Sequence, residues 1–265
     1  MYHRLHQHIA KMQMKKLKNL VSQLDFEPCL AIVQVNDDPA SDAYVRGKLK
    51  DSAEVGIKAL HIKLDPSISE QQLLEKIDQL NNDDSVHGLI VQMPLPKQIS
   101  EDKIKLAVSP KKDVDGFHPL SSFIACTPKG ILNYLKSEKV EFVGKNAVVV
   151  GRSNIVGRPM AKLLLDESAN VTVIHSKTSQ EDKIKYLSNA DIVVVAVGRK
   201  WFLDHSYNLK KDAVLVDVGI NRVDGKLYGD IEPNMDVKLQ TPVPGGVGLL
   251  TRLALLENLI EAATK

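Results

Sequence analysis

The residues best suited to chemistry lie in three segments of the first half of the chain. Tyr44 and Lys48 are four positions apart in a helical stretch, so the phenol ring and the ammonium group share one helix face. Gln92 ends a predicted strand, and Asp115 follows in the segment Lys112–Pro119. Ligands of open parallel sheets bind beyond the carboxyl ends of the strands. A Tyr–Lys pair alone is usually surface decoration, but the convergence with Gln92 predicts a polar site at that rim.

A glycine turn in the second half of the chain predicts an anion site. The strand Asn146–Gly151 runs into the turn 151–157, whose pattern is G-x-S-x-x-x-G, and then into a helix. This order surrounds an anion with backbone N–H groups and the positive end of a helix dipole. Gly151 permits the tight turn, and Gly157 permits close approach of backbone or cofactor. The candidate cofactor contacts here are Gly151, Arg152, Ser153, Ile155 and Gly157.

The next strand favours NADP over NAD. An NAD site places an acidic residue near the end of this strand, where it holds the ribose 2′-hydroxyl. Ser176 and Lys177 stand there instead, and Arg152 lies on the preceding loop. Hydroxyl and cationic donors suit a 2′-phosphate. The glycine turn taken alone is equally compatible with an ordinary βα turn of another α/β protein.

The elements that must position these residues alternate between strand and helix, which is typical of α/β proteins with parallel sheets. The second half carries four nearly continuous apolar runs that predict buried parallel strands. The predicted strands are Cys29–Val35, Lys58–Leu64, His87–Gln92, Asn146–Gly151, Val171–His175, Ile192–Gly198 and Ala213–Gly219. The predicted helices are Arg4–Leu20, Asp42–Val55, a helix capped by Ser69, Thr127–Ser137, Met160–Glu167 and Val247–Ala263.

Composition excludes several classes of protein. The 265 residues are 43% hydrophobic with a formal net charge of +2, so nothing calls for nucleic acid as a partner. The apolar runs are far shorter than the ~20 residues of a membrane span, and we expect neither a membrane association nor a signal peptide. Cys29 and Cys126 suggest no disulfide framework and no metal site, so we expect a cytoplasmic protein without a bound metal.

Nine segments closely resemble the methylenetetrahydrofolate dehydrogenase/cyclohydrolase family, in that family's order. They are DDPASDAYVRGKLKDSAEVGI, GLIVQMPLP, KKDVDGFHP, CTPKGI, VVVGRSNIVGRP, VTVIHSKT, ADIVVVAVG, VDVGINRVDGKLYGD and TPVPGGVG. The resemblance runs from about residue 29 to the C-terminus. It implies the oxidation of 5,10-methylenetetrahydrofolate by NADP to the methenyl form. It also implies hydrolysis of the methenyl form to 10-formyltetrahydrofolate in one-carbon metabolism, by a homodimer.

The resemblance also implies roles for single residues. Tyr44 would stack on the folate, Lys48 would be the central catalytic residue, and Gln92 would orient Lys48. Asp115 would accept hydrogen bonds from the pterin edge. The remaining implied contacts are Ser176 and Ile220 to the cofactor, and Pro244, Gly245 and Gly248 to the substrate.

Three departures separate the chain from the family pattern. The usual opening strand with an Asp-Gly-Lys turn is absent, and the loop Leu120–Ala125 is short. Leu249 and Leu250 stand where the family commonly has Pro-Met. None of these changes removes a candidate catalytic side chain.

We therefore expect an α/β protein of two domains with a catalytic cleft between them. Residues 1–118 would form a folate-binding catalytic domain, and residues 119–245 would form an NADP-binding, Rossmann-like, doubly wound domain. The helix 246–265 would pack back on the first domain. Three alternatives stay open: a dehydrogenase without the hydrolysis step, a shikimate-type NADP dehydrogenase, and a folate- or nucleotide-binding protein without turnover.

Overall fold

A computed structural model describes residues 2–265, and the chain divides into two compact units. Unit 1 contains residues 1–11 and 127–251, and unit 2 contains residues 12–126 and 252–265. Three helices contribute residues to both units: α1 (Tyr2–Ser22), α8 (Val247–Thr264) and α5 (Cys126–Ser137), of which only Cys126 belongs to unit 2. The contacts divide the chain at 126/127 and 251/252, whereas the domain limits expected from the sequence are 118/119 and 245/246. The limits of the functional domains stay a prediction.

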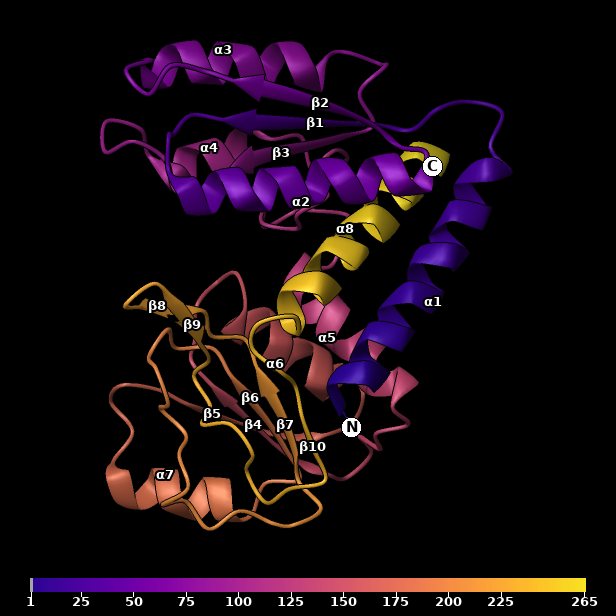
Figure 1. The fold of residues 1–265 in the computed structure, drawn as a ribbon. Coiled ribbons are helices and arrows are strands. Elements are labelled where there is room, and N and C mark those ends of the chain that lie inside the picture. The colour runs from indigo at the N-terminus through magenta and orange to yellow at the C-terminus, as the bar shows by residue number, and fades with distance from the viewer. Residues whose placement is uncertain (1) are drawn as a thin grey trace. The chain divides into compact units, whose positions relative to one another are not determined.

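Unit 2 contains a parallel sheet of three strands in the order β2-β1-β3. Alternate residues of β1, such as Ala31 and Val33, pack with Leu73 and Ile77 of α3. α3 covers this face of the sheet and α2 covers the other (Figure 1). The elements are β1 (Cys29–Gln34), α2 (Pro39–Val55), β2 (Lys58–Lys63), α3 (Glu70–Asn81), β3 (Gly88–Gln92) and α4 (Glu101–Ala107).

The helix starts in unit 2 follow from their capping residues. α2 begins with Pro39 at its first turn, and the Asp38 carboxylate accepts the Ser41 N–H at 2.8 Å. This start lies before the predicted Asp42 because proline needs no N–H partner there. The predicted Ser69 cap is confirmed, and it forms a reciprocal capping box with Gln72. The seven-residue helix α4 was not predicted; Ser100 caps it, and Ile104 is its buried side chain.

Unit 1 contains a parallel sheet of five strands in the order β10-β7-β6-β4-β5. The chain passes from β4 to β5 on one side and then returns to β6 on the other, which makes the sheet doubly wound. The expected α/β class with a Rossmann-like second sheet is thus confirmed. The elements are α5 (Cys126–Ser137), β4 (Asn146–Val150), α6 (Gly157–Asp166), β5 (Asn170–Ile174), α7 (Gln180–Ser188), β6 (Ile192–Val195), β7 (Val214–Asp217), β8 (Asn221–Val223), β9 (Lys226–Tyr228) and β10 (Leu239–Gln240).

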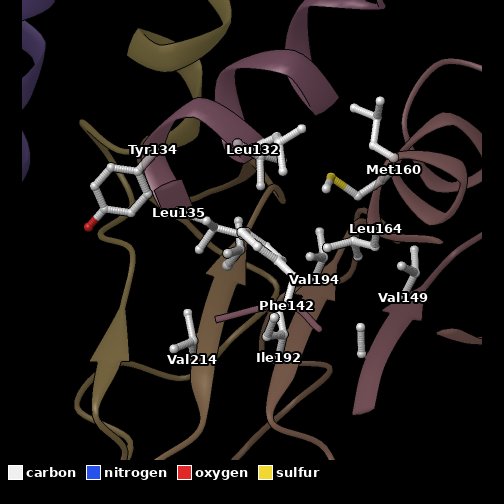
Figure 2. Packing of buried hydrophobic residues seen from close by; sticks show 14 of the residues in the cluster. Leu132, Tyr134, Leu135, Phe142, Val149, Met160, Leu164, Ile192, Val194 and Val214 are labelled. Atoms are coloured by element: carbon white, nitrogen blue, oxygen red, sulfur yellow. The ribbon is translucent and has the colours of Figure 1, made fainter. Parts of the chain in front are cut away.

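Both faces of the unit 1 sheet are covered, which explains why its central strands are continuously apolar. Val149 and Val194 face one core with Leu135 and Met160 (Figure 2). The alternate residues Val148, Val150, Val193 and Val195 enter the opposite core. Among residues 2–265, no helix combines the length and the apolarity that crossing a membrane requires.

The antiparallel pair β8–β9 is an element that the sequence analysis missed. Its turn is Asp224-Gly225, and both residues have positive φ, at 49° and 77°. An Asp-Gly pair is a strong hairpin signal, because both residues of such a two-residue turn need positive φ. The signal was therefore present in the sequence.

Candidate active site

The carboxyl edge of the unit 2 sheet contains a switch point between β1 and β3. From β1 the chain crosses to β2 on one side, and β3 pairs with β1 on the other, with Gln34 opposite Gln92. The segment after β1 leads into α2, so residues of α2 and the end of β3 meet at this edge. Ligands of open α/β sheets bind at such switch points.

Lys48 and Gln92 meet there. The Lys48 ammonium donates to Gln92 Oε1 at 3.1 Å, and Gln92 Nε2 donates to the carbonyl of Met93 at 2.9 Å. The Ser41 hydroxyl also donates to Met93 O, at 3.2 Å, which ties the start of α2 to the turn after β3. The amide of Gln92 is fixed at both ends, so its oxygen is the atom presented to Lys48.

Asp115 is coupled to the same group electrostatically. Burial raises the pKa of the Asp115 carboxyl above its ordinary value, and the charge of Lys48 opposes this rise. The backbone carbonyl of Asp115 accepts the Cys126 N–H at 3.2 Å, which closes the intervening loop. The structure thus brings Lys48, Gln92 and Asp115 together. An ammonium beside a carboxyl of raised pKa is suited to proton exchange with a bound molecule.

Tyr44 lies one helical turn before Lys48, and 37% of the residue is exposed. Partial burial raises the pKa of the Tyr44 phenol, and the charge of Arg252 acts in the other direction. A ring that is half buried and neutral can stack on a flat aromatic ligand.

Several buried polar residues support this site, and the sequence analysis did not single them out. Gln34 is fully buried, donates to Asp42 Oδ1 at 2.7 Å, and shares a hydrogen bond of 2.9 Å with His61 Nε2. Asp113 is also buried and accepts the His118 N–H at 2.8 Å. The hydrogen-bond partners of Gln34 and Asp113 are remote in sequence or belong to the backbone, so no short sequence pattern indicates these two residues.

The glycine turn of unit 1 has the predicted backbone. Gly151 has φ of 113°, and a Cβ there would lie 2.4 Å from Ala196 O. A Cβ on Gly157 would lie 2.4 Å from Gly151 O, so only glycine permits the close passage of the two segments. The Ser153 hydroxyl accepts the N–H groups of Val156 and Gly157, at 3.2 and 3.3 Å, directly before and at the start of α6.

Register brings the two candidate phosphate contacts to one edge. Val150 of β4 is paired with Ile174 of β5, and Arg152 and Ser176 each follow two residues later. Both side chains belong to exposed residues, as does Ile155. A guanidinium and a hydroxyl on neighbouring loops, beside a helix start whose glycines leave room for backbone approach, fit a dinucleotide with a 2′-phosphate.

The other candidate contacts of unit 1 gather around one small cavity of about 60 Å³. Ile220, from the loop after β7, lines it together with Pro244, Gly245 and Gly248. The predicted cofactor residue and the three predicted substrate residues of this unit are therefore neighbours. Among the side chains that the structure describes, those of residues 8–265, His, Cys, Asp and Glu form no group that could hold a metal ion.

Comparison with known proteins agrees with this geometry. A family model described as "Tetrahydrofolate dehydrogenase/cyclohydrolase, catalytic domain" matches residues 3–115. A second, described as "Tetrahydrofolate dehydrogenase/cyclohydrolase, NAD(P)-binding domain", matches residues 125–265. The "Bifunctional protein FolD" of Halalkalibacterium halodurans is 48% identical, over 96% of this chain and 96% of that protein.

Solved structures are similar over nearly the whole chain. The bifunctional FolD methylenetetrahydrofolate dehydrogenase/cyclohydrolase of Campylobacter jejuni has a TM-score of 0.93 at 42% identity, covering 97% of this chain and 96% of that one. The Trypanosoma brucei enzyme, solved with NADP cofactor and an inhibitor, has a TM-score of 0.92 at 30% identity, covering 98% and 96%.

Proposed function

This chain belongs to the tetrahydrofolate dehydrogenase/cyclohydrolase family, and we propose that it catalyses both reactions named by the family. It oxidises 5,10-methylenetetrahydrofolate with NADP and hydrolyses the 5,10-methenyl product to 10-formyltetrahydrofolate. The observation that carries this proposal is the hydrogen bond of 3.1 Å between Lys48 and Gln92, with Asp115 coupled to the same ammonium. The family models span both parts of the chain, which sets the shikimate-type alternative aside.

In this proposal the residues of unit 2 hold the folate. The Tyr44 ring stacks on it, and the Asp115 carboxyl accepts hydrogen bonds from adjacent donors at the pterin edge. A lysine ammonium has three donors, and Gln92 takes one of them, which leaves the ammonium oriented toward the one-carbon group. This positioning is the main contribution of the protein to the first step.

NADP, when bound, accepts the hydride that leaves the methylene carbon. Arg152 and Ser176 hold its 2′-phosphate in the proposal, and the turn at Gly151, Ser153, Ile155 and Gly157 receives the pyrophosphate. Ile220 contacts the cofactor from the loop after β7. Pro244, Gly245 and Gly248 remain proposed contacts of the substrate.

The second step consumes water. Water adds to the cationic methenyl carbon and loses one proton, which gives a neutral hydroxyl adduct. The carbon–nitrogen bond then breaks, the hydroxyl loses its proton as the formyl C=O forms, and the ring nitrogen gains a proton. Two protons are lost and one is gained, so one proton is released overall. The Lys48 ammonium gives a proton to the leaving nitrogen, the amine that results takes up the proton of the hydroxyl, and Gln92 keeps the Lys48 side chain in place. General acid–base help of this kind contributes about 10²–10⁴-fold to a rate.

The test mixes purified protein with methylenetetrahydrofolate and NADP, and follows NADPH and methenyltetrahydrofolate together. NADPH formation without accumulation of the methenyl product, beyond its spontaneous hydrolysis, supports both activities. NADPH with accumulating methenyl product would leave a dehydrogenase alone and implicate the short loop Leu120–Ala125. Folded protein that forms no NADPH in either direction would overturn the enzyme proposal and favour a binding protein.

Two further parts of the proposal concern the state of the protein. We propose a homodimer, by analogy within the family, and a cytoplasmic location, which suits two buried cysteines. Sedimentation velocity measures the first, and a monomer at micromolar concentration would contradict it. Fractionation of cells that express the native chain measures the second.

A further inference from the structure

Two buried carboxylates of unit 1 have no role in the function proposed above. Asp217 ends β7 and is 2% exposed, and Asp230 is fully buried. Both belong to the motif VDVGINRVDGKLYGD. Burying a carboxylate is costly unless hydrogen bonds compensate for lost water, so their partners indicate what they hold in place.

Asp230 binds the loop that follows β6. Its Oδ2 accepts the N–H groups of Val197 and Gly198, at 2.7 and 2.9 Å, and its Oδ1 accepts the Arg199 N–H at 2.8 Å. Oδ1 also accepts the Asn221 side-chain amide at 2.9 Å. One carboxylate therefore fixes three successive backbone groups after β6 and one residue of the segment after β7.

Asp217 fixes the position of Asp230. Its Oδ1 accepts the N–H groups of Gly219 and Asp230, at 3.0 and 2.8 Å, and its Oδ2 accepts the Ile231 N–H at 2.9 Å. A Cβ added to Gly229 would lie 1.8 Å from Asp217 Oδ2. The first carboxylate thus anchors the backbone that carries the second.

The same packing fixes the residue before Ile220. A Cβ on Gly219 would lie 2.1 Å from Asp230 Cγ, so the backbone there lies directly against the carboxylate. Ile220 stands between Gly219, held by Asp217, and Asn221, held by Asp230. Its freedom to move is set by the two acids.

These loops lie at the carboxyl edge that carries the glycine turn. β6 is paired with β4 on one side, with Val195 opposite Val150, and with β7 on the other, with Val195 opposite Asp217. The Val197 side chain lies 3.5 Å from the place where a Cβ on Gly151 would be. The two carboxylates thus lie directly behind the edge at which a dinucleotide binds in this fold.

We propose that Asp230, supported by Asp217, is a positioning residue for the nicotinamide end of the dinucleotide cofactor. It holds the loops 197–199 and 219–221 in one conformation before the cofactor binds, so the nicotinamide ring is bound in one orientation. This inference rests on the proposed function and adds to it a residue that touches neither substrate nor cofactor. Preformed contacts of this kind lower the entropic cost of binding.

The test replaces Asp230 by asparagine, which keeps the shape but turns one oxygen into an N–H₂ group facing backbone donors. The control is Asp204→Asn in the same unit, whose carboxylate binds only the nearby Ser206 in the hydrogen bonds described for it. NADPH affinity is measured by the fluorescence of the bound cofactor. The KM for NADP and the KM for methylenetetrahydrofolate are measured separately, as is hydrolysis of methenyltetrahydrofolate without cofactor.

We expect Asp230→Asn to weaken NADPH binding and raise the KM for NADP by about tenfold to a hundredfold, the effect of a mispaired buried donor. The KM for methylenetetrahydrofolate and the rate of methenyl hydrolysis should stay near those of Asp204→Asn. If NADPH affinity, both KM values and methenyl hydrolysis all worsen to the same degree, Asp230 has a general structural role and the inference is overturned. NADPH binding unchanged from the control would overturn it as well.

A milder variant keeps the test decisive if Asp230→Asn does not fold. Asn221→Ala removes one of the donors to Asp230 and should weaken NADPH binding severalfold, again without loss of methenyl hydrolysis. Unchanged NADPH binding in a folded Asn221→Ala protein would contradict the inference. Failure of the wild-type protein to reduce NADP would instead contradict the proposed function, so the two failures are distinguishable.

Discussion

Replacing Asn258 by leucine should release the segment that carries Asp115. Asn258 is fully buried on α8, and its Nδ2 donates to Val114 O at 2.9 Å and to Ile124 O at 3.0 Å. These two carbonyls lie at either end of the loop that contains Asp115. Leucine has a similar volume and no donor, so the substitution removes the hydrogen bonds without opening a large cavity.

The size of the expected loss of stability depends on which hydrogen-bond donors remain for the two carbonyls after the substitution. Val114 O retains the weak Cys126 thiol donor at 3.1 Å, whereas Ile124 O loses the donor described for it. A lost hydrogen bond costs about 1 kcal/mol, and a buried group left without a partner costs about 1–3 kcal/mol. We expect a total loss of roughly 2–4 kcal/mol in the free energy of unfolding, with a higher KM for folate because Asp115 becomes less well positioned.

Urea unfolding measures the first quantity, and the rate of methenyltetrahydrofolate hydrolysis at varied substrate concentration measures the second. The control is Asn19→Leu, the same change at an exposed helical position, which should alter stability by less than about 0.5 kcal/mol. If Asn258→Leu is no less stable than this control, the argument from the two carbonyls is wrong. If it is less stable but binds folate normally, the link to Asp115 is wrong.

Three further predictions concern the proposed chemistry and the buried acid. Lys48→Ala should reduce methenyl hydrolysis by about a hundredfold or more and leave NADPH affinity unchanged; full hydrolysis, followed by the loss of methenyl absorbance, would refute the role. Arg152→Ala should weaken NADP binding about tenfold and leave NAD binding unchanged, measured by titration calorimetry, because only NADP carries the 2′-phosphate. Burial raises the pKa of Asp217 to about 7, so its protonation stabilises the fold fully below about pH 4 and this contribution disappears as the pH rises through about 7. Urea unfolding across this range should show that decline in the wild type, and an equal slope in Asp217→Asn would contradict it.

Much of the candidate site could be predicted because its parts follow parallel strands. Lys48 follows β1 and Gln92 ends β3, so the topology alone brings them to one edge, and the hydrogen bond between them is consistent with that expectation. The glycine turn could also be predicted from the sequence, since Gly151 and Gly157 lie where a side chain would collide with backbone. Local patterns succeed where the chemistry depends on neighbours in sequence or on the ends of adjacent strands.

The supporting residues were not predictable for the opposite reason. Asn258 binds Val114, 144 positions away, and Asp230 binds Val197, 33 positions away. In each case the acceptor or donor is a backbone group, which every residue possesses, so the sequence offers no complementary partner to search for. A polar residue within an apolar helical face, such as Asn258 among Leu255, Leu256 and Leu259, is the signal that could have pointed to a buried hydrogen bond.

The division of the chain into two units also determines the order in which the units can fold during synthesis. Unit 2 is discontinuous, because residues 127–251 of unit 1 stand between its two segments. The sheet β2-β1-β3 is translated early, but Leu259, which lies 2.7 Å from a Cβ placed on Gly88, arrives only after every strand of unit 1. A nascent chain therefore carries this sheet without the Leu259 contact while residues 127–251 of unit 1 are made. Apolar surface exposed in this way is prone to aggregation until α8 is translated.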